Sequence, residues 1–177
     1  MLSRFSKTSL AGFTMIELMV VVALMSILAG IALPSYNTWV RSIQIRNAGD
    51  AIVNGLQKAR GEAISRNANV QFTLGVASSW VVGCETVTAS CPATIDSRSS
   101  SDGSKDVTVT PNPAGATMVT FNNFGRVGAN DDASASISTI TLSILNGGKN
   151  MQVSIGLGGN AKMCDPSLTA GSSPQAC

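Results

Sequence analysis

Hydrophobic residues are distributed very unevenly along the chain. Residues 13–33 form one apolar block in which Glu17 is the only ionisable side chain. A helix of this length is about 30 Å long, which is enough to cross the hydrocarbon core of a bilayer. The block therefore predicts a membrane-spanning helix, and its single carboxylate needs a partner because an unpaired charge is unfavourable in apolar surroundings.

Beyond the block, apolar residues recur at spacings of three or four. This period indicates a helix with one buried face. Together with the apolar block it predicts one long helix over about residues 14–66, with a kink at Pro34 because proline removes a helical hydrogen bond. The apolar stripe consists of Ile45, Ala48, Ile52, Leu56, Ala59 and Ala63.

After residue 66 the pattern changes to short alternating runs that are typical of strands. We predict a head over residues 67–177, in which a small antiparallel sheet packs on the helix and gives an α+β fold. Residues 93–103 are polar and predict a loop, and Gly125 predicts a tight turn. The predicted strands are residues 70–74, 79–84, 106–110, 118–122, 138–145 and 151–157, with hairpins at the first and last pairs.

Charge and composition exclude several classes of enzyme and metal site. The chain has 177 residues, of which 44% are hydrophobic and only 12% are charged. It has no histidine, which excludes Ser-His and Cys-His catalysis and histidine metal sites. A membrane-anchored enzyme would need a cleft with converging titratable groups, but the acidic residues of the head fall mostly in predicted loops. We therefore predict neither an enzyme nor a cofactor.

Residues 1–12 form a short basic segment in front of the apolar block. An ordinary secretory signal is cut after its apolar run, whereas here the small residues Ala11 and Gly12 precede it. Cleavage after Gly12 would remove a leader of residues 1–12 and leave a free amine on Phe13. That ammonium and the Glu17 carboxylate would lie one helical turn apart, within one chain or between staggered chains. The alternative is a plain membrane anchor with a stray carboxylate.

The stretch "GFTMIELMVVVALMSILAGIALPSY" resembles the N-terminus of type IV pilins and of type II secretion pseudopilins. The resemblance implies that a prepilin peptidase cuts after Gly12 and methylates the amine of Phe13. It also implies that Glu17 acts in assembly and that the helix continues past Pro34.

The head resembles the family shared by FimT and FimU minor pilins and pseudopilin H. The motifs are "LQKARGEAISRN", "WVVGC", "FNNFGRV" and "GGNAKMCDP". The resemblance implies a minor pilin that waits in the inner membrane with its head in the periplasm. It would then join other minor and major pilins in a filament, at or near the tip. The alternative is pseudopilin H of a type II secretion system.

Four cysteines in an exported chain favour disulfides over zinc, because the compartment is oxidising and the chain has no CxxC pair. Three connectivities are possible. We favour Cys84–Cys91 and Cys164–Cys177, because each closes a local loop.

A further expectation concerns DNA. FimT-like proteins of DNA-uptake systems carry two arginines flanking one residue just before the terminal Cys-Asp-Pro. Here Asn160 and Lys162 occupy those places and leave one basic residue. Because phosphate-driven affinity grows with the number of neutralised charges, we expect only weak DNA binding, with Lys162 as its contact.

Overall fold

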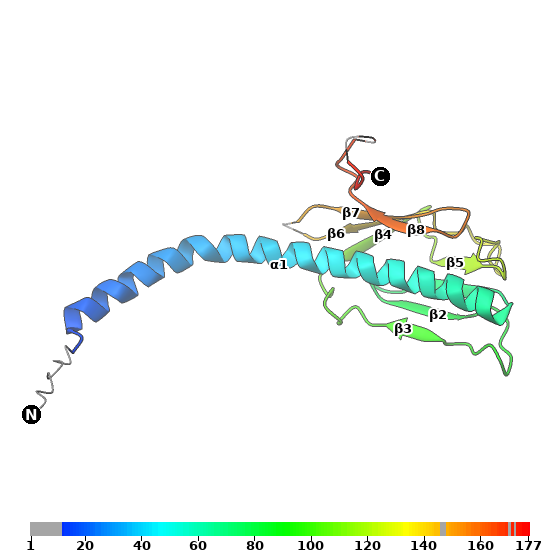
Figure 1. The fold of residues 1–177 in the computed structure, drawn as a ribbon, viewed down its shortest axis with the longest axis horizontal. Coiled ribbons are helices and arrows are strands. Elements are labelled where there is room, and N and C mark those ends of the chain that lie inside the picture. The colour runs from blue at the N-terminus through cyan, green and yellow to red at the C-terminus, as the bar shows by residue number, and fades with distance from the viewer. Residues whose placement is uncertain (1–11, 146–147, 170, 172) are drawn as a thin grey trace, which may run out of the picture. The chain divides into compact units, whose positions relative to one another are not determined.

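The structure is a computed structural model that describes residues 12–145, 148–169, 171 and 173–177. The chain divides into two compact units between Asn37 and Thr38. The leader falls almost entirely outside the described residues, so its removal stays a prediction. One helix, α1, runs from Met15 to Arg66 and belongs to both units (Figure 1). The prediction of one long helix over residues 14–66 is confirmed.

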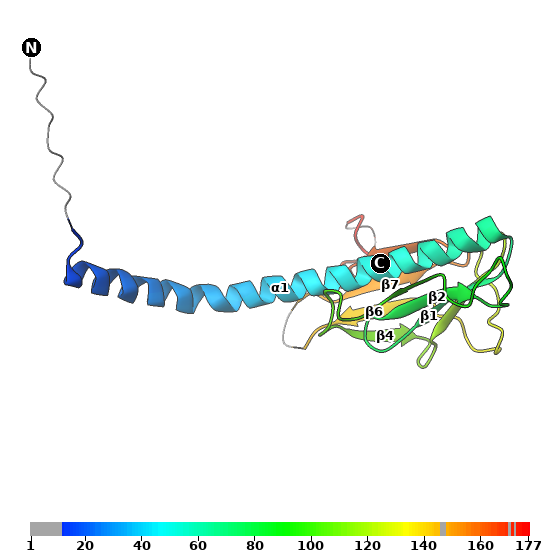
Figure 2. The same ribbon diagram turned by 90° about the horizontal axis from the view of Figure 1, so that it is seen from below.

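Among the described residues, the second unit carries two four-stranded antiparallel sheets instead of the single sheet that was predicted. In the first sheet the strand order is β3-β2-β1-β5, and in the second it is β4-β6-β7-β8. Figure 2 shows the strands laid along the second half of α1. The strands are β1 (Val70–Leu74), β2 (Trp80–Cys84), β3 (Asp96–Arg98), β4 (Thr108–Asn112), β5 (Met118–Phe121), β6 (Thr139–Ser143), β7 (Met151–Ile155) and β8 (Ala161–Cys164).

The hairpin predictions hold. β1 pairs with β2 and β6 pairs with β7, both antiparallel. The loop prediction for residues 93–103 is wrong in part, because β3 lies within it and pairs with β2. The strand predicted at residues 106–110 lies two residues later, at β4, and β8 was not predicted at all.

The core of the second unit lies between α1 and the sheets. All six residues of the predicted stripe, from Ile45 to Ala63, are fully buried. They meet the inward side chains of the strands, such as Phe72 of β1 and Leu142 of β6. The period of three to four therefore identified the buried face of the helix correctly, and the resulting α+β fold agrees with the prediction.

Two helix glycines let a sheet approach closely. A Cβ atom at Gly55 would stand 2.8 Å from Cε2 of Phe72 and 2.9 Å from Cε2 of Trp80. A Cβ atom at Gly49 would meet Sδ of Met163 at 2.4 Å. Glycine is the residue that leaves room at both contacts, whereas a Cβ atom at Gly61 would meet nothing within 4 Å.

Candidate functional site

The beginning of α1 has a defined cap. The hydroxyl of Thr14 accepts a hydrogen bond from the N–H of Glu17 at 3.3 Å. The carbonyl of Thr14 accepts the first helical bond, from Leu18, at 3.2 Å. Thr14 is therefore the N-cap, and Glu17 stands at the third helical position, as in the T-x-x-E capping box. This capping box was not predicted, although its T-x-x-E signature is present in the sequence.

Glu17 is the only ionisable residue of the apolar block. Among the described residues, its carboxylate has no hydrogen bond or ion pair. It is exposed, as are its helical neighbours Ile16 and Leu18, which are 68% and 58% exposed. A negative charge in the first turn interacts favourably with the helix dipole. That local effect does not account for the apolar surface around it.

The apolar surface extends along the whole first part of α1. Large hydrophobic side chains there are exposed by between 40% and 82%, from Met15 to Leu33. This helix is long and apolar enough to cross a membrane. A contiguous apolar surface of this kind marks contact with lipid or with another protein. The segment therefore fits anchoring in a membrane.

Pro34 lies inside α1, and the backbone stays helical on both sides of it. The missing N–H of Pro34 leaves one carbonyl of the preceding turn without its helical partner. The kink at this position remains a prediction.

Both favoured disulfides are present in the structure. Cys84 is joined to Cys91 and Cys164 to Cys177, with Cα–Cα distances of 5.7 and 5.0 Å. Each bridge closes a local loop of the head. The Cys164–Cys177 loop also contains the backbone hydrogen bond from Asp165 N–H to the carbonyl of Gln175.

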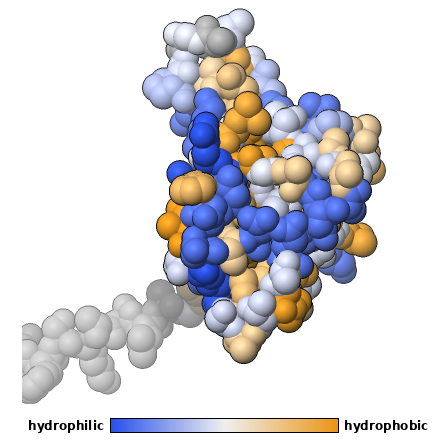
Figure 3. Space-filling view, turned by 90° about the vertical axis from the view of Figure 1, so that its right-hand side faces the viewer, coloured by the Kyte–Doolittle hydropathy of each residue, from blue (hydrophilic) through white to orange (hydrophobic). Residues whose placement is uncertain are grey.

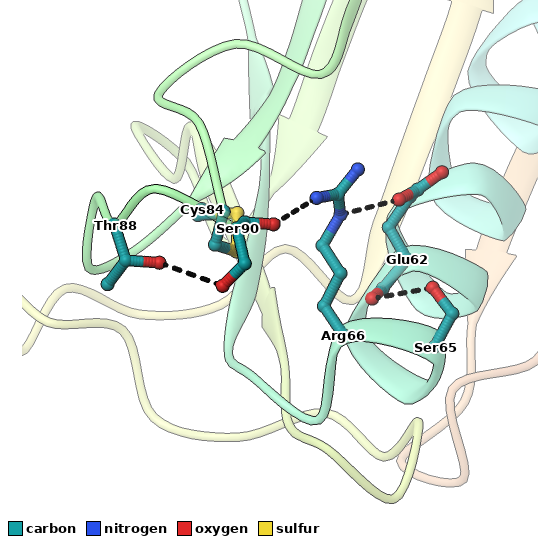
Figure 4. The surroundings of a disulfide bond; sticks show 7 residues. Glu62, Ser65, Arg66, Cys84, Thr88 and Ser90 are labelled. Carbon is teal, nitrogen blue, oxygen red and sulfur yellow. Dashed lines mark hydrogen bonds and ion pairs between the residues drawn. A yellow bond between two sulfur atoms is a disulfide. The ribbon is translucent and has the colours of Figure 1, made fainter.

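The end of α1 is tied to the Cys84–Cys91 loop by charge (Figure 4). Arg66 donates from Nε to Oε2 of Glu62 at 2.7 Å, and its Nη1 donates to the carbonyl of Ser90. Lys58 lies 3.2 Å from Oε1 of the same glutamate. The hydrogen bond from Arg66 lowers the pKa of Glu62 below its ordinary value, and Lys58 adds to the effect. The charges of this network neutralise one another within the chain, so we assign it a structural role.

Two other carboxyl groups of the head have lowered pKa values, and both have local causes. The hydroxyl and N–H of Ser134 lower the pKa of Asp132. Those of Ser167 lower the pKa of Asp165, whose Oδ2 also lies 3.8 Å from Nζ of Lys149. These acids belong to separate loops. In the part of the chain that the structure describes, no three His, Cys, Asp or Glu side chains gather as metal ligands.

Lys162 lies on β8 opposite Ser154 of β7 and is exposed. The carbonyl of Asn160, the other position of the expected basic pair, accepts a hydrogen bond from Gly156 and closes the preceding turn. Asn160 is uncharged, so Lys162 is the single basic residue at the two positions of the expected pair. The DNA contact at Lys162 stays a prediction.

Two sequence models of known families match parts of this chain. The sequence model of the family described as Type II transport protein GspH matches residues 48–159. The Prokaryotic N-terminal methylation motif matches residues 9–33.

Type IV major fimbrial protein FimA of Dichelobacter nodosus is 46% identical over 46 residues. The same protein from strain VCS1703A gives the same values. The match spans 26% of this chain and 28% of the length of these curated relatives.

Two crystal structures of the type IV minor pilin FimU from Pseudomonas aeruginosa PAO1 are also similar. Their TM-scores are 0.46 and 0.49 at 18% and 19% identity, and each match covers 75% of this chain. The matches cover 98% and 94% of the two FimU chains. The GspH family model spans well over half of the chain, and the methylation motif covers the apolar start of α1. The chain therefore belongs to the GspH family of type IV pilin-like minor pilins and pseudopilins, which are structural proteins.

Proposed function

We propose that this chain is a minor pilin of a type IV pilus. A prepilin peptidase cuts it between Gly12 and Phe13, and α1 holds it in the inner membrane until it enters the filament. The observation that carries this proposal is the exposed apolar segment of α1 with Glu17 as its only charge. A lipid anchor needs the apolar surface but not the carboxylate, whereas packing among like helices gives both a role.

Glu17 supplies the register of assembly in this proposal. Cleavage creates an ammonium on Phe13, which is methylated and keeps its charge. When helices stagger in an apolar filament core, the carboxylate of one chain neutralises the ammonium of its neighbour. An unpaired ion in such surroundings costs several kcal/mol, so the paired arrangement is strongly selected.

The head faces the periplasm and then the filament surface. Two disulfides in the head support this compartment, because disulfides persist in oxidising surroundings. The head contacts other minor and major pilins at or near the tip and helps to start assembly.

The second candidate is pseudopilin H of a type II secretion system. The printed description of the matching family, Type II transport protein GspH, favours it. Both candidates share processing and helix packing, so the two are separated in cells. Deletion of the gene should abolish or reduce pilus display and leave protein secretion intact. Loss of secretion with normal pili would instead establish the pseudopilin.

The test of the assembly mechanism uses two substitutions at Glu17. Glu17→Val removes the charge, and Glu17→Gln also removes it but keeps the length and hydrogen-bonding capacity of the side chain. Both should leave the membrane level of the protein unchanged, since a more apolar span still inserts. Both should lower its amount in sheared filaments by about tenfold or more, as expected for an unpaired buried charge.

Glu17→Gln separates pairing from helix capping. If Glu17 only stabilises the first turn of α1, the glutamine variant should enter filaments like wild type. That result would refute the pairing mechanism. Intact mass measurement of protein from the native host checks the processing step, and an uncut chain would rule out the proposal as a whole.

A further inference from the structure

We infer that the end of the head at the C-terminus of α1 is a docking surface for a different, acidic protein. Three large apolar side chains are exposed there although they lie in a folded unit. Ile64 is 50% exposed, Phe124 76% and Leu157 82%. They come from the last turns of α1, the turn after β5 and the turn between β7 and β8. We call these three residues the end patch.

Hydrogen bonds and close contacts join the three elements. The N–H of Val127 donates to the carbonyl of Leu157 at 3.2 Å. Nε of Arg60 donates to the carbonyl of Gly125 at 3.0 Å. A Cβ atom at Gly125 would stand 2.6 Å from Cδ1 of Ile64. Figure 3 faces this end of the head and shows hydrophobic surface among hydrophilic residues.

The turn that presents Phe124 is already fixed. Oδ1 of Asn122 accepts the N–H groups of Phe124 and Arg126, each at 3.0 Å. The N–H of Gly125 donates to the carbonyl of Asn122 at 2.8 Å, and Gly125 has a φ of 71°, which favours glycine. A rigid turn that exposes an aromatic ring loses little entropy on binding, as is typical of the anchors of protein interfaces.

The charge beside the end patch defines the partner. In the described residues, no carboxylate oxygen lies within 4.0 Å of the guanidinium of Arg60 or Arg126. The nearby Arg66, in contrast, is neutralised by Glu62. Arginines that lack an ion pair and lie beside an apolar patch are complementary to a protein that offers a carboxylate next to an apolar hollow.

Two other occupants fit less well. A second copy that used the same surface would bring like charges together. Nucleic acid would find Arg60, Arg126 and Lys162 of β8 near this end, which are few charges for phosphate-driven affinity. The inference concerns the head alone and holds whether α1 enters a pilus or a secretion pseudopilus.

The experiment uses the full chain in its native host, with a photoreactive phenylalanine analogue at position 124 or at position 76. Val76 is the matched control, because it is 87% exposed and follows β1 at the end of the sheet away from Phe121. We expect position 124 to give a cross-link to a different protein, at least about tenfold stronger than position 76. The cross-linked peptide should contain Asp or Glu beside apolar residues.

Charge reversal then tests the role of Arg126, whose contribution to the turn is made by its backbone. Arg126→Glu should reduce the cross-link at position 124 about tenfold and Arg126→Gln about threefold, whereas Lys105→Glu, in a loop of the same head, should not change it. Replacing the partner's acidic residue with arginine should restore the cross-link to Arg126→Glu. The inference is overturned by an absent or charge-independent cross-link, by equal cross-linking at position 76, or by a product with a second copy or with nucleic acid.

Discussion

The two halves of α1 have the same backbone conformation but find their partners in different places. In the half that belongs to the head, one face is fully buried against the sheets, as at Ile52 and Leu56. In the half before Asn37, comparable side chains are exposed, with Leu28 at 66% and Ile31 at 73%. The partners of the second half are encoded in this chain, whereas those of the first half must come from lipid or from other subunits.

The difference can be traced to the arrangement of polar residues. In the second half, polar and charged residues separate the stripe from the rest of the helix surface, which is typical of a helix with one buried face. In the first half the apolar residues surround the helix, which is typical of a fully buried helix. Folding of the head therefore buries the apolar face of the second half and leaves the apolar surface of the first half exposed.

A matched pair of leucines gives the strongest test of this difference. Leu56→Ala should lower the free energy of unfolding of the head by about 2–5 kcal/mol, because it empties a fully buried position. Leu28→Ala should leave that free energy unchanged. Urea unfolding of the detergent-solubilised full chain, followed by the fluorescence of buried Trp80, measures both. Equal effects would mean that the first half also contributes to the stability of the head.

The disulfides offer a second test, since all four cysteines lie in the head. Replacing Cys164 and Cys177 together by serine should destabilise the head by up to about 3 kcal/mol, and the shorter Cys84–Cys91 loop should give slightly less. Membrane insertion should not change. Non-reducing peptide mapping checks the pairing directly, and a peptide that joins Cys84 to Cys164 would contradict it.

Substitution of three helix glycines by alanine compares the two halves of α1 at single positions. Gly55→Ala should destabilise the head by about 1–3 kcal/mol, because the new methyl group collides with Phe72 and Trp80. Gly61→Ala should stabilise it by up to about 1 kcal/mol through helix propensity, since its surroundings are open. Gly30→Ala, also open, should not affect the head. Thermal unfolding ranks the three variants, and a stabilising Gly55→Ala would show that the sheet can shift away from the helix.

Sequence patterns sufficed for the elements that carry strong periodicity. The long helix, its buried stripe and both predicted hairpins follow from spacing and turn residues. β3 and β8 were missed because they are short and carry charged residues, so that pairing with β2 and β7 decides their conformation. Their strand state is a property of the neighbouring strand more than of their own residues.

The candidate site was also only partly predictable. A lone carboxylate in an apolar block draws attention to Glu17 without any structure. The end patch could not be predicted, because Ile64, Phe124 and Leu157 are far apart in the sequence. Their approach depends on the turns at Gly125 and Gly159, where a Cβ atom on Gly159 would stand 2.0 Å from the carbonyl oxygen of Gly125.

The smallest expected effect is that of a single carboxylate on the stability of the head. It compares Glu62, in the second half of α1, with Glu17, in the first half. Because Arg66 lowers the pKa of Glu62, the folded head releases this proton more readily than the unfolded chain does. The resulting stabilisation is complete above the ordinary carboxyl range, near pH 4–5, and is lost as the pH falls through the lowered pKa. Glu62→Gln should therefore cost less than about 1 kcal/mol at pH 7, as for other pairs near a surface, and should lose less stability than wild type on acidification.

Glu17→Gln is the control for this measurement. Its carboxylate has no partner in the described part of the chain, so the variant should follow the wild-type curve for unfolding of the head at every pH. Urea midpoints at pH 7 and pH 3 decide the matter. If Glu62→Gln runs parallel to wild type, the Glu62–Arg66 pair contributes nothing to folding. If instead the urea midpoints of Glu17→Gln differ from those of wild type, the first half of α1 is coupled to the stability of the head. The proposed independence of the two halves would then be wrong.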